Sequence, residues 1–525
     1  MKRLVAGLWL LGLMVVFPSG AFAHDLTDVA TMLRPKNPYD ARLSVGFRST
    51  WKTASLNREY MGNNKGIEVV KDLRFKQVKM ELDVRGEFAI FKDLALYVSL
   101  PIILSQQSTY SFASGNRYPG YSGEENCRKD HADDPSVCNP DGVNVNNSRT
   151  VRDGIAAGLP GTGISYDPTG PSVGLDGAWA VPMDGSAGPR TLFKGPKRAG
   201  LDQLHFGLRW LVYGFNQDVN PVMPNWLIGA EFRLSVGKVM DFKRNAAGDP
   251  EGCDAYSTND WNCRPQLNKA VSRGVHELRF YTTMSKRVGP TDSFIEISFK
   301  MPFAYRSGSF YSSKYDFSGG WGEDNTSVVN KAPKVAGIRF GTEIVAWKRP
   351  ADHFRLAISV LGLIKYRFQG RDYSEAYELL AGSPVMNMNC DSPSALYSAM
   401  CGDTGIRKAM TYYPGVTMVQ DYAIFGGQLG IDFLIYKYIK LQVSYGFAHQ
   451  QEHFVTMTDA GQDSGTVQAG NDGCQSGQAC ADGRVNIPSR EQNPWHRPVV
   501  DTPGHRYRVQ ETLIHQLWVN LQARF

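Results

Sequence analysis

Long stretches of this chain place an apolar residue at every second position. In residues 78–85, Val, Met, Leu and Val alternate with Lys, Glu, Asp and Arg. Side chains of a strand point alternately to its two faces, so this period predicts β-strands with one apolar and one charged face. The pattern recurs to the end of the chain. It predicts twelve strands, over residues 40–52, 73–91, 94–105, 203–214, 226–240, 273–288, 293–303, 335–347, 353–368, 418–435, 438–448 and 508–525.

The lengths of these strands and of their connections narrow the fold class. Strands of soluble sheets average about five or six residues, whereas a tilted strand that crosses a bilayer needs about 9–11 residues. Short turns alternate with long loops, as in membrane β-barrels, while a soluble β-sandwich needs short connections. An even strand count places both chain ends on the short-turn side. The predicted long loops cover about 53–72, 106–202, 241–272, 304–334, 369–417 and 449–507.

The first residues have the pattern of a secretory signal peptide. Lys2 and Arg3 precede an apolar run over residues 4–17, and Ala21 and Ala23 supply the small residues of a cleavage site. We therefore expect a signal peptide over residues 1–23 and a mature chain over 24–525. Loss of Lys2 and Arg3 lowers the formal charge from +6 to +4, and no basic run remains. The sequence gives no reason to expect nucleic acid as a partner.

Eight cysteines form four pairs that are close in sequence. An even number of cysteines in an exported chain predicts disulfides, and zinc clusters usually have a CxxC spacing that does not occur here. Each disulfide would close a short loop, and each pair falls in one of the predicted long loops. The predicted pairs are Cys127 with Cys138, Cys253 with Cys263, Cys390 with Cys401, and Cys474 with Cys480.

The last residues, LWVNLQARF, resemble the terminal strand of Gram-negative outer-membrane β-barrel proteins. In that class the chain ends on an aromatic residue, here Phe525, with apolar residues at alternate positions before it. The resemblance implies an all-β fold, a twelve-stranded antiparallel transmembrane β-barrel in the outer membrane with long, disulfide-stapled extracellular loops. It also implies that the outer-membrane assembly machinery reads Phe525, and that the bilayer and lipopolysaccharide surround the barrel. Such a class-level resemblance does not identify a function.

Because the apolar face of a membrane barrel meets lipid, the alternation predicts which residues line the lumen. Basic groups outnumber acidic groups among them, so the interior is expected to be electropositive. The candidates are Glu81, Asp83, Arg85, Arg209, Glu231, Arg233, Arg279, Arg287, Arg339, Glu343, Arg355, Lys365 and Arg367, with further charges at Arg42, Arg48, Lys79, Glu87, Glu277, Glu296, Lys300, Asp432, Lys440 and Arg524.

Two interpretations of this lumen remain open. The charges can pair across neighbouring strands and fill a closed barrel, because charges need partners when they leave water and twelve strands enclose little space. Alternatively, the surplus of basic groups forms a path that favours anions. The Gly- and Pro-rich loop over 106–202 can fold inward or cover the mouth.

One motif suggests an enzyme. HQQEHF, residues 449–454, has the HxxEH order of a zinc-peptidase signature, which needs a helix to bring both histidines and the glutamate together. Here it continues a strand, so His449 and His453 are expected on the outer face and Glu452 on the other. The other candidates near the outer rim, His496, His505, Glu511 and His515, depend on loop folding.

The sequence therefore predicts a passive outer-membrane channel for small polar or anionic solutes, which is not an enzyme and holds no cofactor or metal. The alternative is a closed barrel that displays its loops for adhesion or envelope assembly. An outer-membrane hydrolase is a third and weaker hypothesis.

Overall fold

The computed structural model describes most of the strands and parts of the loops. The described residues are 27, 29–31, 40–62, 66–113, 148–156, 165–166, 179–180, 191–213, 224–240, 242–243, 266–267, 269–307, 309, 311, 331–349, 354–381, 383, 416–436, 438–458 and 496–525. Residues 1–23 and all eight cysteines lie outside them, so the predicted signal peptide and disulfides stay predictions.

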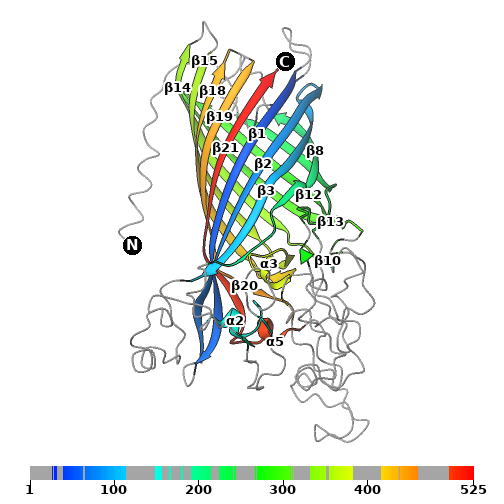
Figure 1. Cartoon of the computed structure of the whole chain (residues 1–525). Coiled ribbons are helices and arrows are strands. Elements are labelled where there is room, and N and C mark those ends of the chain that lie inside the picture. The colour runs from blue at the N-terminus through cyan, green and yellow to red at the C-terminus, as the bar shows by residue number, and fades with distance from the viewer. Residues whose placement is uncertain are drawn as a thin grey trace, which may run out of the picture.

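Twelve antiparallel strands form a closed barrel, as predicted (Figure 1). Each strand pairs with the next strand of the wall, and β21 pairs with β1 to close the ring. In order around the wall the strands are β1 (Ala41–Gly62), β2 (Gly66–Phe91), β3 (Leu94–Phe112), β8 (Gln203–Tyr213), β9 (Asn225–Ser235), β12 (Val275–Val288), β13 (Thr291–Tyr305), β14 (Val335–Arg349), β15 (Phe354–Arg367), β18 (Tyr422–Ile435), β19 (Ile439–Gln450) and β21 (Tyr507–Arg524).

The outer face of the wall is apolar, as the alternation predicts. On β12, Phe280 and Met284 are each 47% exposed, whereas Tyr281 is 9% exposed and Thr283 is fully buried. Large apolar side chains exposed in this way match a lipid-facing belt, since water would disfavour them. Several of the exposed aromatic residues lie near the short-turn end, where membrane barrels carry one of their two aromatic girdles: Phe91, Trp210, Trp226, Trp347, Tyr436, Tyr438 and Phe525.

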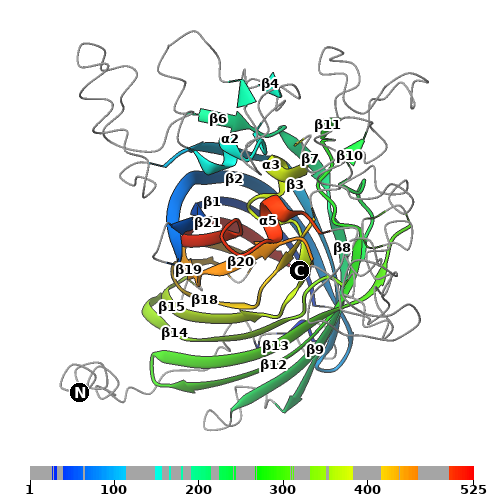
Figure 2. The same ribbon diagram turned by 90° about the horizontal axis from the view of Figure 1, so that it is seen from below.

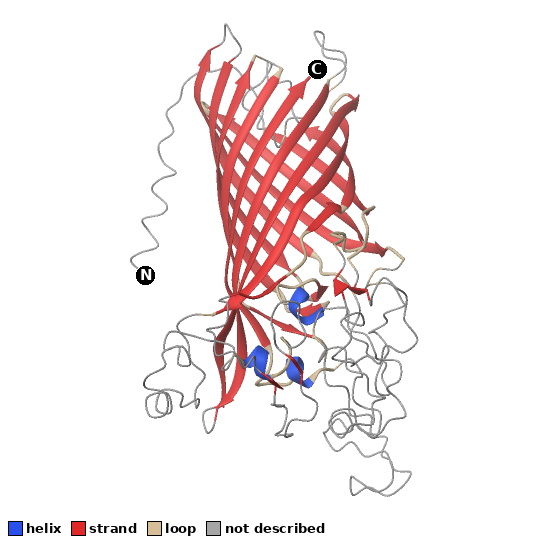
Figure 3. Ribbon diagram, in the orientation of Figure 1, coloured by secondary structure: helices blue, strands red, loops and turns tan. Residues whose placement is uncertain are grey.

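The first predicted long loop, 53–72, is wrong. β1 continues to Gly62 and β2 begins at Gly66, so most of that stretch is a paired hairpin. The two strands have 22 and 26 residues, far more than the roughly 9–11 that cross a bilayer. Their outer ends therefore stand beyond the membrane, and the hairpin extends past the rest of the barrel (Figure 3). The sequence did not predict this extension because polar residues such as Asn57 and Arg58 interrupt the alternation of apolar and polar positions there.

The main apolar core lies at the outer end of the barrel. On β2 the inner face changes from charged residues, Lys79 and Glu81, to buried Phe75 and Leu73. Short elements pack on this apolar surface and over one side of the opening (Figure 2). We call these elements the outer cap: α2 (Arg149–Arg152), β6 (Thr191–Lys194), α3 (Tyr377–Ala381), β20 (His453–Thr456) and α5 (Pro498–Asp501).

Further short strands lie beside or beyond the wall. They are β4 (Ser165–Tyr166), β5 (Trp179–Ala180), β7 (Arg198–Leu201), β10 (Phe242–Lys243), β11 (Gln266–Leu267), β16 (Gly370–Asp372) and β17 (Thr417–Val419). No helix in the described part of the chain is long and apolar enough to span a membrane.

Buried polar contacts fix the cap to the long hairpin. The Asp72 carboxylate accepts hydrogen bonds from the backbone N–H groups of Arg149 and Thr150, at 3.1 and 2.9 Å, and so binds the start of α2. Arg58 forms a fully buried ion pair with Asp153, just after α2. These contacts hold α2 against β1 and β2.

Candidate functional site

The charged interior of the barrel is the first part of the candidate site. The residues predicted to line the lumen lie on six strands of the wall, at positions that alternate with the outward apolar residues. They are Glu81, Asp83 and Arg85 on β2, Arg209 on β8, Glu231 and Arg233 on β9, Arg279 and Arg287 on β12, Arg339 and Glu343 on β14, and Arg355, Lys365 and Arg367 on β15.

Ion pairs form both within and between the strands of this interior. Glu87 of β2 binds Arg209 of β8 at 2.9 Å and Arg85 of its own strand at 3.1 Å. Glu231 and Arg233 pair at 2.5 Å on β9. Glu87, Glu231 and Arg209 are almost fully buried. Arg85 and Arg233 keep 33% and 23% of their side-chain exposure and lie nearer the lumen solvent.

The same pairing continues around the wall. Glu296 of β13 binds Arg279 of β12 at 2.7 Å and Arg339 of β14 at 2.6 Å. Glu343 pairs with Arg355 on the next strand. Asp83 instead accepts a hydrogen bond of 2.6 Å from the Ser99 hydroxyl.

Two tyrosines cross the inner wall over glycines. The Tyr97 ring lies over Gly207 of β8, where an added Cβ would come within 2.2 Å of the ring. Its hydroxyl donates to Glu231 of β9. Tyr281 of β12 lies over Gly229 of β9 in the same way. Only glycine leaves room for such a crossing, so the two positions fix the aromatic rings against the wall.

Lys365 differs from the other interior cations. It is exposed, although it lies on the inner face of β15 between outward-facing Ile364 and Tyr366. Its strongest electrostatic interactions are with cations, foremost Arg339 and Lys300. Within the described residues no carboxylate forms an ion pair with Lys365. Its ammonium group therefore faces a water-accessible lumen.

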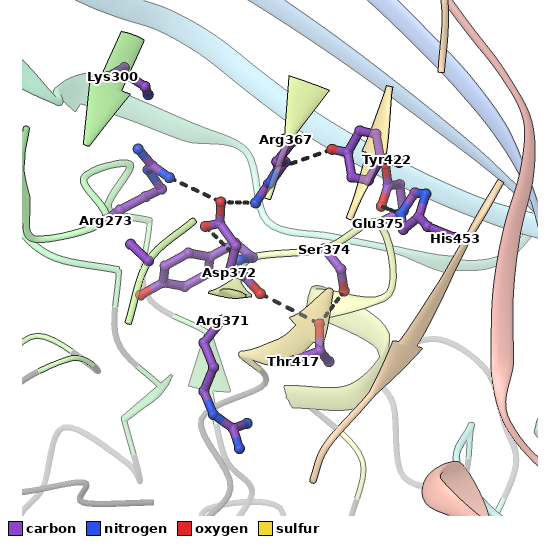
Figure 4. A network of polar contacts seen from close by, with 12 residues as sticks. Arg273, Lys300, Arg367, Arg371, Asp372, Ser374, Glu375, Thr417, Tyr422 and His453 are labelled. Carbon is purple, nitrogen blue, oxygen red and sulfur yellow. Dashed lines mark hydrogen bonds and ion pairs between the residues drawn. The ribbon is translucent and has the colours of Figure 1, made fainter. Parts of the chain in front are cut away.

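The second part of the site lies at the outer mouth, in residues 370–381, and Figure 4 shows the polar contacts of Asp372 and Glu375 there. We call these residues the mouth segment. Asp372 accepts a hydrogen bond of 3.0 Å from Arg273, which precedes β12, and pairs with Arg367 at the end of β15. Arg367 also donates to the Tyr422 hydroxyl at 3.1 Å.

A second carboxylate of the mouth segment binds another part of the wall. Glu375 accepts hydrogen bonds from Lys52 of β1 at 2.5 Å and from Gln450 of β19 at 3.2 Å. His453 Nε2 lies 3.8 Å from Glu375 Oε2, and the His453 ring stacks on Tyr422 with 4.3 Å between ring centroids. The mouth segment is thus tied to several strands of the barrel at once.

The charges around both carboxylates keep them ionised. Burial acts to raise the pKa of Glu375, but Lys52 and His453 outweigh it and hold that pKa well below its usual range. Burial likewise acts to raise the pKa of Asp372, and Arg273 and Arg367 reverse this and lower it. The mouth segment is therefore held by charge-assisted hydrogen bonds, which are the stronger kind.

A segment ahead of β1 enters the barrel at the short-turn end. Val29 and Ala30 are almost fully buried and pack with Ala95, Leu227 and Tyr281 of the inner wall. The Ala30 N–H donates to Glu87 at 3.2 Å. The lumen is therefore narrowed at both ends, by this segment and by the mouth segment.

The expected placement of the HQQEHF motif is partly wrong. β19 ends at Gln450, and the chain leaves the strand pattern at Gln451 and Glu452 before β20 begins at His453. This break shifts the alternation by one residue, so His453 is 2% exposed on the inner side while Glu452 is exposed. His449 stays on the outer face, so the motif is split between the two faces.

The remaining rim candidates lie apart from one another. His515 accepts or donates a 2.7 Å hydrogen bond with the Tyr445 hydroxyl on the outer face. His505 lies 3.6 Å from Asp153, and His496 lies 3.6 Å from Asp501, both in the cap. Glu511 pairs with Lys71 at 2.6 Å. Phe525 lies at the seam of the barrel, where its N–H donates to the Ala41 carbonyl at 2.8 Å.

Sequence reasoning missed the anchors of the mouth segment. Lys52 follows Arg48 at the inward period of β1 and is the last residue of the predicted strand 40–52, so the alternation indicates its inward direction but not its partner. Asp372 and Glu375 lie in a predicted loop, where no periodicity indicates which side chains enter the barrel. Arg273 is the first residue of the predicted strand 273–288, and the sequence gives no signal of its partner.

No family model matches the chain, and no curated protein matches it. Among solved structures, a COG4313 outer membrane channel from Pseudomonas putida F1 is 7% identical, with a TM-score of 0.32 over 97% of this chain and 100% of that one. The outer membrane protease OmpT from Escherichia coli is 7% identical, with a TM-score of 0.26 over 93% and 96%. A FadL homologue from Pseudomonas aeruginosa is 8% identical, with a TM-score of 0.29 over 93% and 90%.

Likenesses this weak carry no argument about activity. The class follows from the molecule itself, which has an even number of antiparallel strands, a closed ring, an apolar outer belt and a charged interior. Such strands satisfy all their backbone hydrogen bonds only when the ring is closed, as a bilayer requires. The chain folds as a closed, twelve-stranded antiparallel β-barrel of the membrane-spanning type.

Proposed function

We propose that this barrel is a passive channel of the outer membrane for small polar solutes, with a preference for anions. The observation that carries the proposal is Lys365, an interior cation that is exposed to solvent and surrounded by Arg339 and Lys300. A cluster of fixed positive charges on a low-dielectric wall attracts anions and repels cations. In this proposal the barrel moves solutes and is not an enzyme.

Access would be controlled at the mouth segment. Its two carboxylates are bound by wall cations, so it occupies the outer opening while these ion pairs last. Lid opening and local unfolding of this kind take about microseconds to seconds and would appear as brief openings. The proposal therefore expects small, flickering currents rather than a wide and steady pore.

The test is the current through the full chain in a planar bilayer with a tenfold KCl gradient. We expect a reversal potential that favours chloride. Lys365→Gln should lower this preference, while Lys79→Gln removes a lumen cation of the same type that is already paired with Glu81 at 2.6 Å and should change it less. Cation preference in the folded wild-type protein would refute the proposal.

A closed barrel that presents its outer surface to partners is the second candidate. It is favoured by the outer cap, whose apolar core lies beyond the membrane and closes over the inner face of β1 to β3. The same bilayer experiment separates the two functions. Correctly folded protein that carries no current, even when the mouth segment is released by Glu375→Gln, would favour the closed barrel.

A further inference from the structure

Four cations surround a bare part of the inner wall. Lys365 of β15 lies directly opposite Gly337 of β14, which in turn lies opposite Ser298 of β13. Gly337 has no side chain, and the Ser298 hydroxyl donates to the Gly337 carbonyl at 3.4 Å. An added Cβ at Gly337 would lie 3.6 Å from Lys365 Cγ, so the lysine chain passes over this floor.

The other three cations stand at the edges of the same floor. Arg339 is two residues beyond Gly337 on β14. Lys300 is two residues beyond Ser298 on β13, and Arg279 of β12 lies directly opposite Lys300. All side chains at this period point into the lumen, so the four cations converge on one patch. We call it the cation patch: Arg279, Lys300, Arg339 and Lys365.

The carboxylates nearby do not neutralise the patch. Arg279 and Arg339 share the carboxylate of Glu296, and Arg279 also lies 3.9 Å from Glu231, whose shorter pair is with Arg233. Lys300 shares Glu277 with Arg273, at 2.9 and 2.6 Å respectively. Lys365 adds a charge for which the described residues supply no carboxylate partner.

Adding the next neighbours leaves this surplus unchanged. Arg233 is balanced by Glu231, with which it pairs at 2.5 Å. Arg367 is balanced by Asp372 of the mouth segment. The uncompensated positive charge therefore belongs to the patch itself.

The patch is open to a ligand. The side chains of Arg279, Lys300 and Arg339 retain 19%, 21% and 33% of their exposure, so each guanidinium or ammonium group still reaches lumen solvent. Guanidinium groups bind carboxylate and phosphate oxygens through paired N–H donors, which a monatomic anion cannot match. The bare floor at Gly337 and Ser298 leaves space for a group of several atoms.

We propose that the cation patch is a binding site for a small oxyanion of two negative charges, either a phosphate or a dicarboxylate. The inference names the solute class of the proposed channel and in that sense rests on it, but binding requires no conduction. Arg279 and Arg339 would hold oxygens with the N–H groups that Glu296 does not occupy, and Lys365 would supply a positive charge that no described carboxylate neutralises. Solute would thus pause at this point of the lumen.

Binding is tested on the full chain, folded in detergent free of lipopolysaccharide, by the ³¹P NMR line width of inorganic phosphate. We expect broadening that saturates in the millimolar range and is reversed by succinate if dicarboxylates bind the same cations. Lys365→Gln should weaken binding about tenfold, since one close charge pair near a protein surface is worth roughly this much or more. Lys79→Gln should leave it unchanged.

A second variant fills the site without removing a cation. Ser298→Asp places a carboxylate at the floor of the patch and should abolish broadening while the barrel stays folded, as judged by its mobility in unheated gels. Broadening that survives both Lys365→Gln and Ser298→Asp would overturn the site. If both variants abolish the broadening but the wild-type protein carries no current, the binding site is supported and only the channel function is refuted.

Discussion

Asp372 and Glu375, three residues apart in the mouth segment, are bound to opposite parts of the barrel wall. Asp372 is held by Arg273 at the start of β12, and Glu375 by Lys52 of β1. β1 and β12 lie nearly across the ring from each other (Figure 2). A short piece of chain therefore bridges the opening, and its position depends on two separate sets of ion pairs.

Glu375→Gln should release one end of the mouth segment. The glutamine keeps the shape but loses the charge, so the bond to Lys52 loses about 1.5–3 kcal/mol, the usual worth of a hydrogen bond to a charged group. Hydrogen exchange of the α3 amides should speed up accordingly, and open-channel current should rise. Asp83→Asn, which alters a lumen carboxylate away from the mouth, is the control and should leave α3 exchange unchanged. Equal protection in both variants would contradict the bridge.

The buried pair of Arg58 and Asp153 should be the most sensitive point of the outer cap. Both side chains are fully buried, so Arg58→Ala leaves Asp153 without its main counter-charge and should cost about 3–5 kcal/mol of cap stability. The exposed pair of Lys71 and Glu511 provides the control, since Lys71→Ala should cost at most about 1 kcal/mol. Urea titration followed by limited proteolysis of the cap measures both. A similar loss of cap stability in the two variants would contradict the view that the buried pair of Arg58 and Asp153 is especially important for the cap.

Asp501 should make the cap less stable as pH rises. Burial raises the pKa of Asp501 to about 7, although the N–H groups of Arg497, Met457 and Thr458 donate to its carboxylate. The folded cap therefore keeps a proton that the unfolded chain loses near pH 4, so this contribution is full below that pH and is lost as pH rises through 7. Glu375, with its lowered pKa, acts in the opposite direction and only at lower pH.

The comparison of wild type with Asp501→Asn isolates this contribution. The asparagine cannot ionise, so the difference in cap stability between the two proteins should change between pH 5 and pH 8 in favour of the variant. Hydrogen exchange of the Met457 amide, corrected for its intrinsic rate at each pH, follows the change. A difference that stays constant with pH would mean that Asp501 is ionised throughout.

Gly207→Ala should disturb the inner wall. An alanine Cβ would lie 2.2 Å from the Tyr97 ring, so the ring must move and its hydrogen bond to Glu231 must break, at a cost of about 1–3 kcal/mol. Gly446→Ala, whose Cβ meets nothing closer than 3.5 Å, should be nearly neutral. Thermal unfolding in detergent compares them. Equal melting temperatures would show that the Tyr97 ring can move away from the added Cβ at no cost in stability.

The barrel was predictable from sequence because its chemistry repeats every two residues. Phe280 and Met284 face outward toward lipid while Tyr281 and Thr283 face inward, so the alternation of apolar and polar residues indicates which face of the strand meets the membrane. The segments of the outer cap have no such periodic pattern in their sequence. Leu379 of α3 and Val455 of β20 pack together only because distant loops return to the barrel, and no local period encodes a contact of that kind. His453 shows that alternation also fails where a strand is interrupted. The break at residues 451 and 452, between β19 and β20, turns His453 from the expected outer face to the inner face.

The seam between the first and last strands runs through the core of the cap. Leu56 of β1 lies opposite Val509 of β21, and both are fully buried there with residues of α2, α3 and α5. Contacts between such distant parts of a chain form late, because the intervening loops must be ordered first. Packing of the cap must therefore follow delivery of the last strand to the first. A barrel that has not yet closed would expose the apolar outer ends of β1 and β2, so limited proteolysis would distinguish unclosed molecules from closed ones.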